Sequence, residues 1–132
     1  MALQLLVVTP ERKAVETEAD EVELPGSEGY LGILPGHTPL ITLLKPGVLS
    51  FKRAGRSQAF AVSTGFAEIA SDRVSVLVDS ALAGTEIDAA AAEREKAKAE
   101  EEMKTAGIDT LEPIRARIDL AEARLTAARR PS

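Results

Sequence analysis

Few residues of this sequence could perform chemistry, and they do not form a catalytic set. Enzymatic chemistry requires a nucleophile with a base, a metal site or a cofactor cradle. The chain has a single histidine, His37, and no cysteine, which excludes thiol catalysis, thiolate metal ligands and a histidine cluster. It contains no Walker-type or dinucleotide-type glycine loop, and the carboxylates between Glu86 and Glu102 fall on an expected solvated helix. We therefore predict a protein without catalytic activity, resident metal or cofactor.

Two segments resemble pieces of functional sites but favour ordinary turns. His37 lies in the Pro- and Gly-containing segment 34–39, where a lone histidine is usually a hydrogen-bonding or contact residue. Residues 29–32 partly resemble a phosphate-binding glycine loop, but no helix with a basic phosphate ligand follows them. We expect a plain loop there.

Length and charge narrow the class of protein. The chain has 132 residues, of which 45% are apolar and 28% charged, enough for one domain or a small domain with an appendage. A net charge of −5 and only four aromatic residues argue against a nucleic-acid binder. The longest uncharged stretch, residues 29–44, is interrupted by glycine and proline, so we expect no transmembrane helix and no membrane insertion. No signal peptide is visible, which favours a cytoplasmic or organelle-interior protein.

Composition changes once along the chain, near Ala83 and Gly84. All nine valines lie at or before Val78, whereas 14 of the 22 alanines lie after position 80. Because β-branched residues favour strands and alanine favours helices, we expect β structure in residues 1–84 and helices in residues 85–132.

The first part predicts an antiparallel sandwich or barrel of short strands. In residues 73–79 the alternation is clean, with Val74, Val76 and Val78 on one face. Glycine and proline dipeptides separate the expected strands, among them Pro25-Gly26. The strand-like runs are residues 3–9, 14–19, 21–24, 40–44, 48–52, 58–63, 66–70 and 74–79.

The second part predicts two antiparallel helices. Asp88 is a good N-cap for a first helix that runs to about residue 105 and stops at Gly107. The second helix is expected to start behind Asp109 or Thr110, with Asp109 and Glu112 in capping-box spacing. Its first turn would then hold Pro113, and it ends by residue 130, before Pro131.

The expected contact between the helices is narrow and rich in alanine. Small residues bury little apolar area, so we predict a hairpin that is marginally stable alone and must lean on the sandwich or on a partner. The seam of the second helix has heptad spacing and consists of Ile114, Ile118, Ala121, Leu125 and Ala128. The first helix offers Ala92, Ala99, Met103 and Ala106.

A long motif carries a family resemblance. Residues 23–40 read ELPGSEGYLGILPGHTPL and are followed by Lys45-Pro46-Gly47. This pattern, with supporting segments at residues 8–11, 63–66 and 79–81, resembles the ε subunit of bacterial and chloroplast F-type ATP synthases, whose mitochondrial counterpart is called δ.

The resemblance implies a fold and a role. It implies a ten-stranded β-sandwich followed by a C-terminal helical hairpin. It implies a non-catalytic rotor subunit that couples c-ring rotation to the catalytic head and whose helices inhibit ATP hydrolysis. The implied partners are the γ subunit, the c-ring and the catalytic α and β subunits. The implied location is the cytoplasmic face of the bacterial inner membrane, or the equivalent plastid face.

The resemblance also assigns two contact segments in the sandwich. The loop formed by Glu28, Gly29, Tyr30 and Leu31 is expected to face the c-ring. Several relatives carry an acid in place of Tyr30, so this contact should be more apolar and less sensitive to salt. The expected γ contact consists of His37, Thr38, Pro39 and Leu40. The alternative for both segments is an ordinary role in the turns and core of the sandwich.

The resemblance assigns an inhibitory role to the basic second helix. The arginines outside its apolar seam are Arg115, Arg117, Arg124, Arg129 and Arg130. They are expected to meet an acidic segment of the catalytic β subunit. The alternative is a solvated helix face on which Arg115 and Asp119 form an ordinary i,i+4 pair.

A nucleotide-sensing module is the alternative function. Some relatives bind ATP through an I-D-x-x-R-A motif, of which this chain keeps Ile87 and Asp88 but has Ala91 where the arginine would stand. Lys98 and Arg124 could supply further basic positions. Without the arginine, the capping role of Asp88 explains that residue, and only a weak ATP site is expected.

Overall fold

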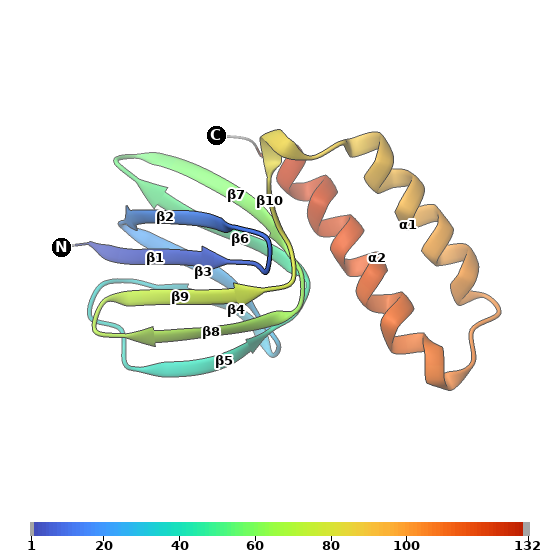
Figure 1. The fold of residues 1–132 in the computed structure, drawn as a ribbon, viewed down its shortest axis with the longest axis horizontal. Helices are drawn as coiled ribbons and strands as arrows, with labels where there is room; N and C mark the ends of the chain where they lie inside the picture. The colour runs from blue at the N-terminus through green and yellow to red at the C-terminus, as the bar shows by residue number, and fades with distance from the viewer. Residues whose placement is uncertain (1, 131–132) are drawn as a thin grey trace.

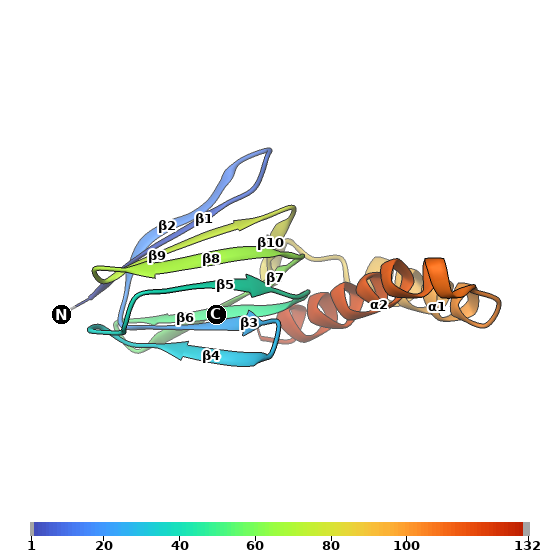
Figure 2. The ribbon, with the colours of Figure 1, turned by 90° about the horizontal axis from the view of Figure 1, so that it is seen from below.

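Ten strands in two packed layers precede a pair of antiparallel helices (Figures 1 and 2). The computed structural model describes residues 2–130, so Met1, Ser132 and the Pro131 expected after the second helix lie outside it. The strands are β1 (Leu3–Val8), β2 (Lys13–Ala19), β3 (Glu21–Gly26), β4 (Gly29–Ile33), β5 (Leu40–Leu44), β6 (Gly47–Arg53), β7 (Arg56–Val62), β8 (Gly65–Ala70), β9 (Arg73–Val78) and β10 (Ala81–Ala83). A 3₁₀ turn (Gly84–Glu86) leads to α1 (Ala89–Met103) and α2 (Ile108–Ala128).

The strands are hydrogen-bonded in the order β10-β7-β6-β3-β5-β8-β9-β1-β2, and β4 pairs with β3. The two layers, β10-β7-β6-β3-β4 and β5-β8-β9-β1-β2, are joined where Gly26 pairs with Leu44 (Figure 2). The pairs are antiparallel except that β1 lies parallel to β9. The expected fold class is therefore confirmed, with this one departure from a purely antiparallel arrangement.

The core lies between the two layers. The valines of β9 are 0–5% exposed, as their alternation predicts. Leu5 of β1 and Leu49 of β6 are equally buried in the same cluster. Each such side chain contributes about 1.5–3 kcal/mol by leaving water. The sandwich is thus held by large side chains contributed by both layers.

Two sequence predictions in the region of residues 25–33 are wrong. The pair Pro25-Gly26, expected to form a turn, completes β3, and the turn falls on Ser27 and Glu28. Residues 29–32, expected to be a plain loop, form most of β4. The hydrogen bonds of β3 determine both results, because its Gly26 pairs with Gly29 so closely that a Cβ at position 26 would lie 2.7 Å from the Gly29 carbonyl oxygen.

The cap of α1 is confirmed, whereas that of α2 is wrong. The Asp88 carboxylate accepts a hydrogen bond from the Ala91 backbone N–H at 3.1 Å. Helix α2 begins at Ile108, and Gly107 is its N-cap without a side-chain hydrogen bond. Asp109 therefore lies inside the first turn, and Pro113 lies two or three positions further into the helix than expected, where it leaves the Asp109 carbonyl without its helical donor.

The hairpin docks on the sandwich through α2. Figure 1 shows α2 between α1 and the end of the sandwich. Ala123 and Ala127 of α2 pack on Val48, Ala59 and Ala61 of β6 and β7. These two alanines lie outside the expected seam of α2. From that seam, Ile114 and Ile118 pack on Ala99 of α1. The prediction that the hairpin leans on the sandwich is confirmed, and the contact is small.

Candidate functional site

The two contact segments expected in the sandwich lie at opposite ends of the same strands. The turn at Glu28 sits beside the end of β5, because the Ser27 N–H donates to the Leu43 carbonyl at 2.9 Å. The loop at residues 34–39 sits beside the β8–β9 turn, because the Gly36 N–H donates to the Asp72 carboxylate at 2.7 Å. Figure 2 shows the first at the hairpin end of the sandwich and the second at the far end. The two segments are therefore separate surfaces of the sandwich.

Of the four residues expected to face the c-ring, the structure places Glu28 at the exposed tip. Gly29, with a φ of +132°, opens β4, and Leu31 packs against the sandwich core. Tyr30 is 50% exposed, but its hydroxyl oxygen accepts the Val48 backbone N–H at 2.9 Å. The ring is therefore fixed on the hairpin side of the sheet rather than projecting from the tip.

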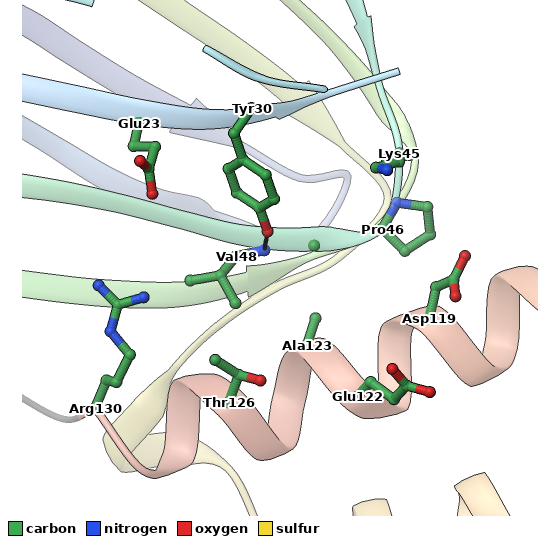
Figure 3. A pocket seen from close by; sticks show the side chains of 11 residues that line it. Glu23, Tyr30, Lys45, Pro46, Val48, Asp119, Glu122, Ala123, Thr126 and Arg130 are labelled. Atoms are coloured by element: carbon green, nitrogen blue, oxygen red, sulfur yellow. Dashed lines mark hydrogen bonds between the residues drawn. The ribbon is translucent and has the colours of Figure 1, made fainter. Parts of the chain in front are cut away.

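Tyr30 forms one wall of a cleft between the sandwich and α2 (Figure 3). The cleft has a volume of about 530 Å³. It is lined by Glu23, Tyr30, Lys45, Pro46, Gly47 and Val48 from the sandwich and by Asp119, Glu122, Ala123, Thr126 and Arg130 from the helix. Acidic and basic side chains are mixed there. The cleft runs along one side of α2 from Asp119 to Arg130, beside the contact that Ala123 and Ala127 make with the sandwich.

The segment expected to contact γ is a structured loop. Gly36 has a φ of +88°, which a side chain would strain. The His37 ring Nδ1 lies 2.6 Å from the Thr38 carbonyl oxygen, and Leu40 packs against the core. Thr38 and Pro39 are exposed. Half of the segment thus has a turn or core role, and half is available to a partner.

An exposed apolar surface, missed by sequence reasoning, covers the outer face of β5, β8 and β9. We define the apolar patch as Ile41, Leu43, Phe66 and Leu77, which are 43–70% exposed. The strand register aligns Leu43 with Phe66 and Phe66 with Leu77. Contiguous exposed apolar side chains of this kind mark interaction sites. The signal in the sequence was the run of residues 40–44, which is apolar on both faces.

The apolar patch continues into a groove at the hairpin end of the sandwich. The groove has a volume of about 480 Å³. It is lined by Val8, Thr9, Pro10, Thr64, Gly65, Phe66, Leu77, Val78 and Asp79. Phe66 and Leu77 belong to both the patch and the groove, so a single partner could cover them together.

The five arginines expected to inhibit hydrolysis do not form one free surface. Arg115, Arg129 and Arg130 are exposed, and no Arg115–Asp119 ion pair occurs within residues 2–130. Arg117 is bound to carboxylates of α1. Arg124 is half-buried, with an Nε that has no hydrogen-bond partner among the described atoms. The exposed basic groups are therefore Arg115, about two turns into α2, and the pair Arg129 and Arg130 just after its last residue.

The four residues expected to bind ATP are not gathered into a site. Ile87 packs on the cluster that docks α2, and the Asp88 carboxylate caps α1. Lys98 lies ten residues further along the same helix, a rise of about 15 Å. Nucleotide binding remains a prediction of the family resemblance.

A salt bridge ties the linker before α1 to the sandwich. The Arg12 guanidinium donates to both carboxylate oxygens of Glu86, at 3.0 and 2.9 Å, and to the Ala81 carbonyl at 2.9 Å. Glu86 also accepts the Ala83 backbone N–H. The hydrogen bond from Arg12 lowers the pKa of Glu86, and the N–H of Ala83 adds to this effect. The base of the hairpin is thus fixed up to residue 86.

Two kinds of structural feature are absent from residues 2–130. Between residues 2 and 130, no helix combines the length and hydropathy needed to cross a bilayer. In the same range, no group of three or more histidine, aspartate or glutamate side chains is placed to hold a metal ion.

Comparison with known proteins gave consistent results. A sequence profile described as "ATP synthase, Delta/Epsilon chain, beta-sandwich domain" matches residues 2–84. The ATP synthase epsilon chain of Myxococcus xanthus is 40% identical over 127 residues, covering 96% of this chain and 91% of the relative. That of Magnetococcus marinus is 39% identical over 129 residues, covering 96% and 94%.

Two solved structures share the fold. A chain of the Euglena gracilis mitochondrial ATP synthase, in its OSCP/F1/c-ring structure, superposes with a TM-score of 0.83 at 20% identity, covering 96% of this chain and 81% of that chain. A chain of the Tetrahymena thermophila central stalk and c-ring structure gives a TM-score of 0.66 at 12% identity, covering 96% of both. The sandwich and hairpin together are therefore an arrangement found in other proteins.

Proposed function

The chain belongs to the ATP synthase delta/epsilon chain family, and from this premise we propose how its surfaces serve a rotary ATP synthase. It is a non-catalytic, peripheral subunit of the central stalk. The sandwich, residues 1–84, binds the γ subunit and the c-ring, and the hairpin, residues 85–132, regulates ATP hydrolysis through the catalytic α and β subunits. The assembly lies at the cytoplasmic face of the bacterial inner membrane, or the equivalent plastid face.

The observation that carries the γ contact is the apolar patch. Its side chains are exposed in the isolated chain, whereas the opposite face of the same strands forms the core. Covering them would remove apolar area from water at about 25 cal/mol per Å². The exposed Thr38 and Pro39 of the preceding loop lie next to this surface, directly before the start of β5. We assign the patch and this loop to γ.

Co-purification tests the γ contact. A tagged chain carrying Leu43→Glu should lose co-expressed γ, because a carboxylate would be placed in the apolar interface. Leu43 is 67% exposed, so the free chain should fold normally, as circular dichroism can verify. Ile108→Glu is the matched control, since Ile108 is 89% exposed at the far tip of the hairpin. Retention of γ by Leu43→Glu would remove the patch from the interface.

The turn between β3 and β4 is our candidate for the c-ring contact. Glu28 is its exposed acid, and Tyr30 is fixed behind it by the hydrogen bond to Val48. Glu28→Lys should reduce ATP-driven proton pumping in membrane vesicles more than it reduces ATP hydrolysis. Glu18→Lys makes the same charge change on exposed β2 and should leave both unchanged. Equal pumping in the two variants would argue against the assignment.

The hairpin is the candidate inhibitory element. Its attachment to the sandwich consists largely of alanines, which makes detachment inexpensive in apolar area. Removing all residues after Gly84 from the assembled complex should raise ATP hydrolysis while the γ contact persists. Hydrolysis that stays the same after truncation would leave the rotor role intact but remove the inhibitory one.

A further inference from the structure

Arg117 differs from the other arginines of α2 because it binds two carboxylates of α1. Its Nη1 and Nη2 atoms donate to the two oxygens of Glu102 at 3.0 and 2.9 Å, a bidentate arrangement. Its Nε donates to Glu95 at 2.9 Å, and Nη2 lies 2.8 Å from the same oxygen. Glu95 and Glu102 are seven residues apart on α1, so both project from one side of that helix. One guanidinium thus binds two successive turns of α1 to α2.

In the rest of the contact between the helices, α1 contributes only small buried side chains. Only Ala92 and Ala99 are buried among the residues of α1, and each brings a single methyl group. Ala99 meets Ile114 and Ile118, with Met103 and Ala106 partly buried beside them. Each alanine methyl of α1 contributes about 0.8 kcal/mol by burial, whereas Ile114 and Ile118 of α2, which are 8% and 9% exposed, contribute more. The ion-pair network therefore adds to a seam in which the buried side chains of α1 are alanines.

The environment of the network allows it to be opened. The side chains of Arg117, Glu95 and Glu102 are 36–42% exposed. Half-exposed ion pairs are weakened by salt and contribute modestly, although a bidentate network contributes more than a single pair. Because these groups are already partly hydrated, the Arg117 guanidinium can exchange Glu95 and Glu102 for carboxylates of a partner at a small cost in desolvation free energy.

We propose that Arg117 is a positioning residue that clamps α1 onto α2 and so determines whether the hairpin is closed. In the closed form Arg117 is engaged by Glu95 and Glu102 and is not one of the free basic groups of α2. Any partner that binds the α1-covered face of α2 must displace these two carboxylates. The clamp itself rests on the geometry of this chain, whereas its effect on hydrolysis rests on the function proposed above.

Hydrogen exchange on the isolated full-length chain tests the clamp. In Arg117→Gln, the amides of α1 between residues 92 and 103 should exchange about fivefold faster, while those of the sandwich stay unchanged. Arg117→Lys keeps the charge but loses the bidentate fork and should give an intermediate value. High salt should accelerate α1 exchange in the unchanged chain and have little effect in Arg117→Gln.

Two further variants separate a clamp from a general packing role. Arg115→Gln removes the same charge two residues away on α2 and should leave α1 exchange unchanged. Reversing the charges, with Arg117→Glu together with Glu95→Lys and Glu102→Lys, should restore protection that Arg117→Glu alone removes. Equal exchange in Arg117→Gln and the unchanged chain, or no recovery on charge reversal, would overturn the proposal.

Hydrolysis assays keep the clamp distinct from the proposed inhibition. If Arg117→Gln accelerates α1 exchange and also changes ATP hydrolysis in the assembled complex, the clamp regulates the inhibitory element. If exchange accelerates while truncation after Gly84 leaves hydrolysis unchanged, the clamp stands and the inhibitory function fails.

Discussion

The sandwich and the hairpin are built from side chains of different size, and this difference separates a permanent unit from a releasable one. Leu3, Leu5 and Leu49 are 0–1% exposed within the sandwich core. The hairpin docks through Ala123 and Ala127 and closes on Ala99 and two isoleucines. Burying a leucine contributes about 1.5–3 kcal/mol against roughly 0.8 for a methyl group. The hairpin can therefore detach under conditions that leave the sandwich folded.

The largest effect should come from the sandwich core. Leu49→Ala leaves a cavity between the layers and should lower the free energy of unfolding by about 3 kcal/mol. Leu43→Ala, which removes the same atoms from a side chain that is 67% exposed, should change it by less than about 0.5 kcal/mol. Chemical denaturation followed by circular dichroism measures both. Equal losses would mean that the two faces of the sandwich do not differ as described.

The docking contact should give the next effect. Ala127 is 0% exposed against the sandwich, so Ala127→Glu would bury a carboxylate without a partner, at a cost of about 2 kcal/mol or more. The hairpin should swing away, and the thermal midpoint of the sandwich should hardly move. Because the chain has no cysteine, labels on cysteines introduced at Ile108 and Gln58 can report the distance between the tip of the hairpin and the sandwich. Thr110→Glu, at an exposed position of α2 away from the sandwich, should leave that distance unchanged.

The cap of α1 should matter less. Asp88→Ala removes the hydrogen bond to the Ala91 N–H and should destabilise the helix by about 1 kcal/mol. Amide exchange should accelerate in the first turns of α1 and not in β6 or β7. Asp88→Asn, which can still cap the helix, should recover most of the protection. Faster exchange throughout the sandwich would contradict the independence of the two units.

Acid should produce the smallest effect, and its direction follows from two carboxyl groups. Hydrogen bonds from Arg117 lower the pKa of Glu102, and those from Arg12 lower the pKa of Glu86. Each group thus stabilises the folded chain fully above its usual value near 4.5, and this contribution is lost as the pH falls through the lowered pKa. As the pH falls through the lowered pKa values, labels at Ile108 and Gln58 should report a longer distance between the hairpin and the sandwich. A Glu86→Gln, Glu102→Gln variant should show a smaller change.

Sequence reasoning succeeded where a local pattern determines the outcome. Val74, Val76 and Val78 occupy every second position of their strand, and this pattern correctly predicted that they are buried. Asp88 stands directly before a run of alanines, and this position correctly predicted that it caps the helix. It failed at β4, because Gly29 and Gly32 are typical of a loop. These residues form a strand because they pair with β3, and that pairing is not evident in the sequence. It also missed the apolar patch, since Phe66 and Leu77 become neighbours only through strand register.

The arginines show the same limit at the candidate site. Their positions on one helix could be read from the sequence, but their different environments could not. Arg117 meets Glu95 and Glu102, which lie 22 and 15 residues earlier in the chain. That meeting depends on the register of two helices joined by a short turn. Assignments taken from family resemblance alone therefore treated as equivalent five side chains that the fold separates.

The parallel pairing of β1 with β9 bears on the order of events during synthesis. Residues 4–8 find their partners in residues 73–77, so the amino-terminal strand emerges from the ribosome long before its neighbour exists. Long-range pairings of this kind slow folding, because a large loop must close before the contact forms. The layer can be completed only after about three-fifths of the polypeptide has been made. During that interval β2 is the only sheet neighbour available to β1, and a two-stranded ribbon alone is marginally stable in water.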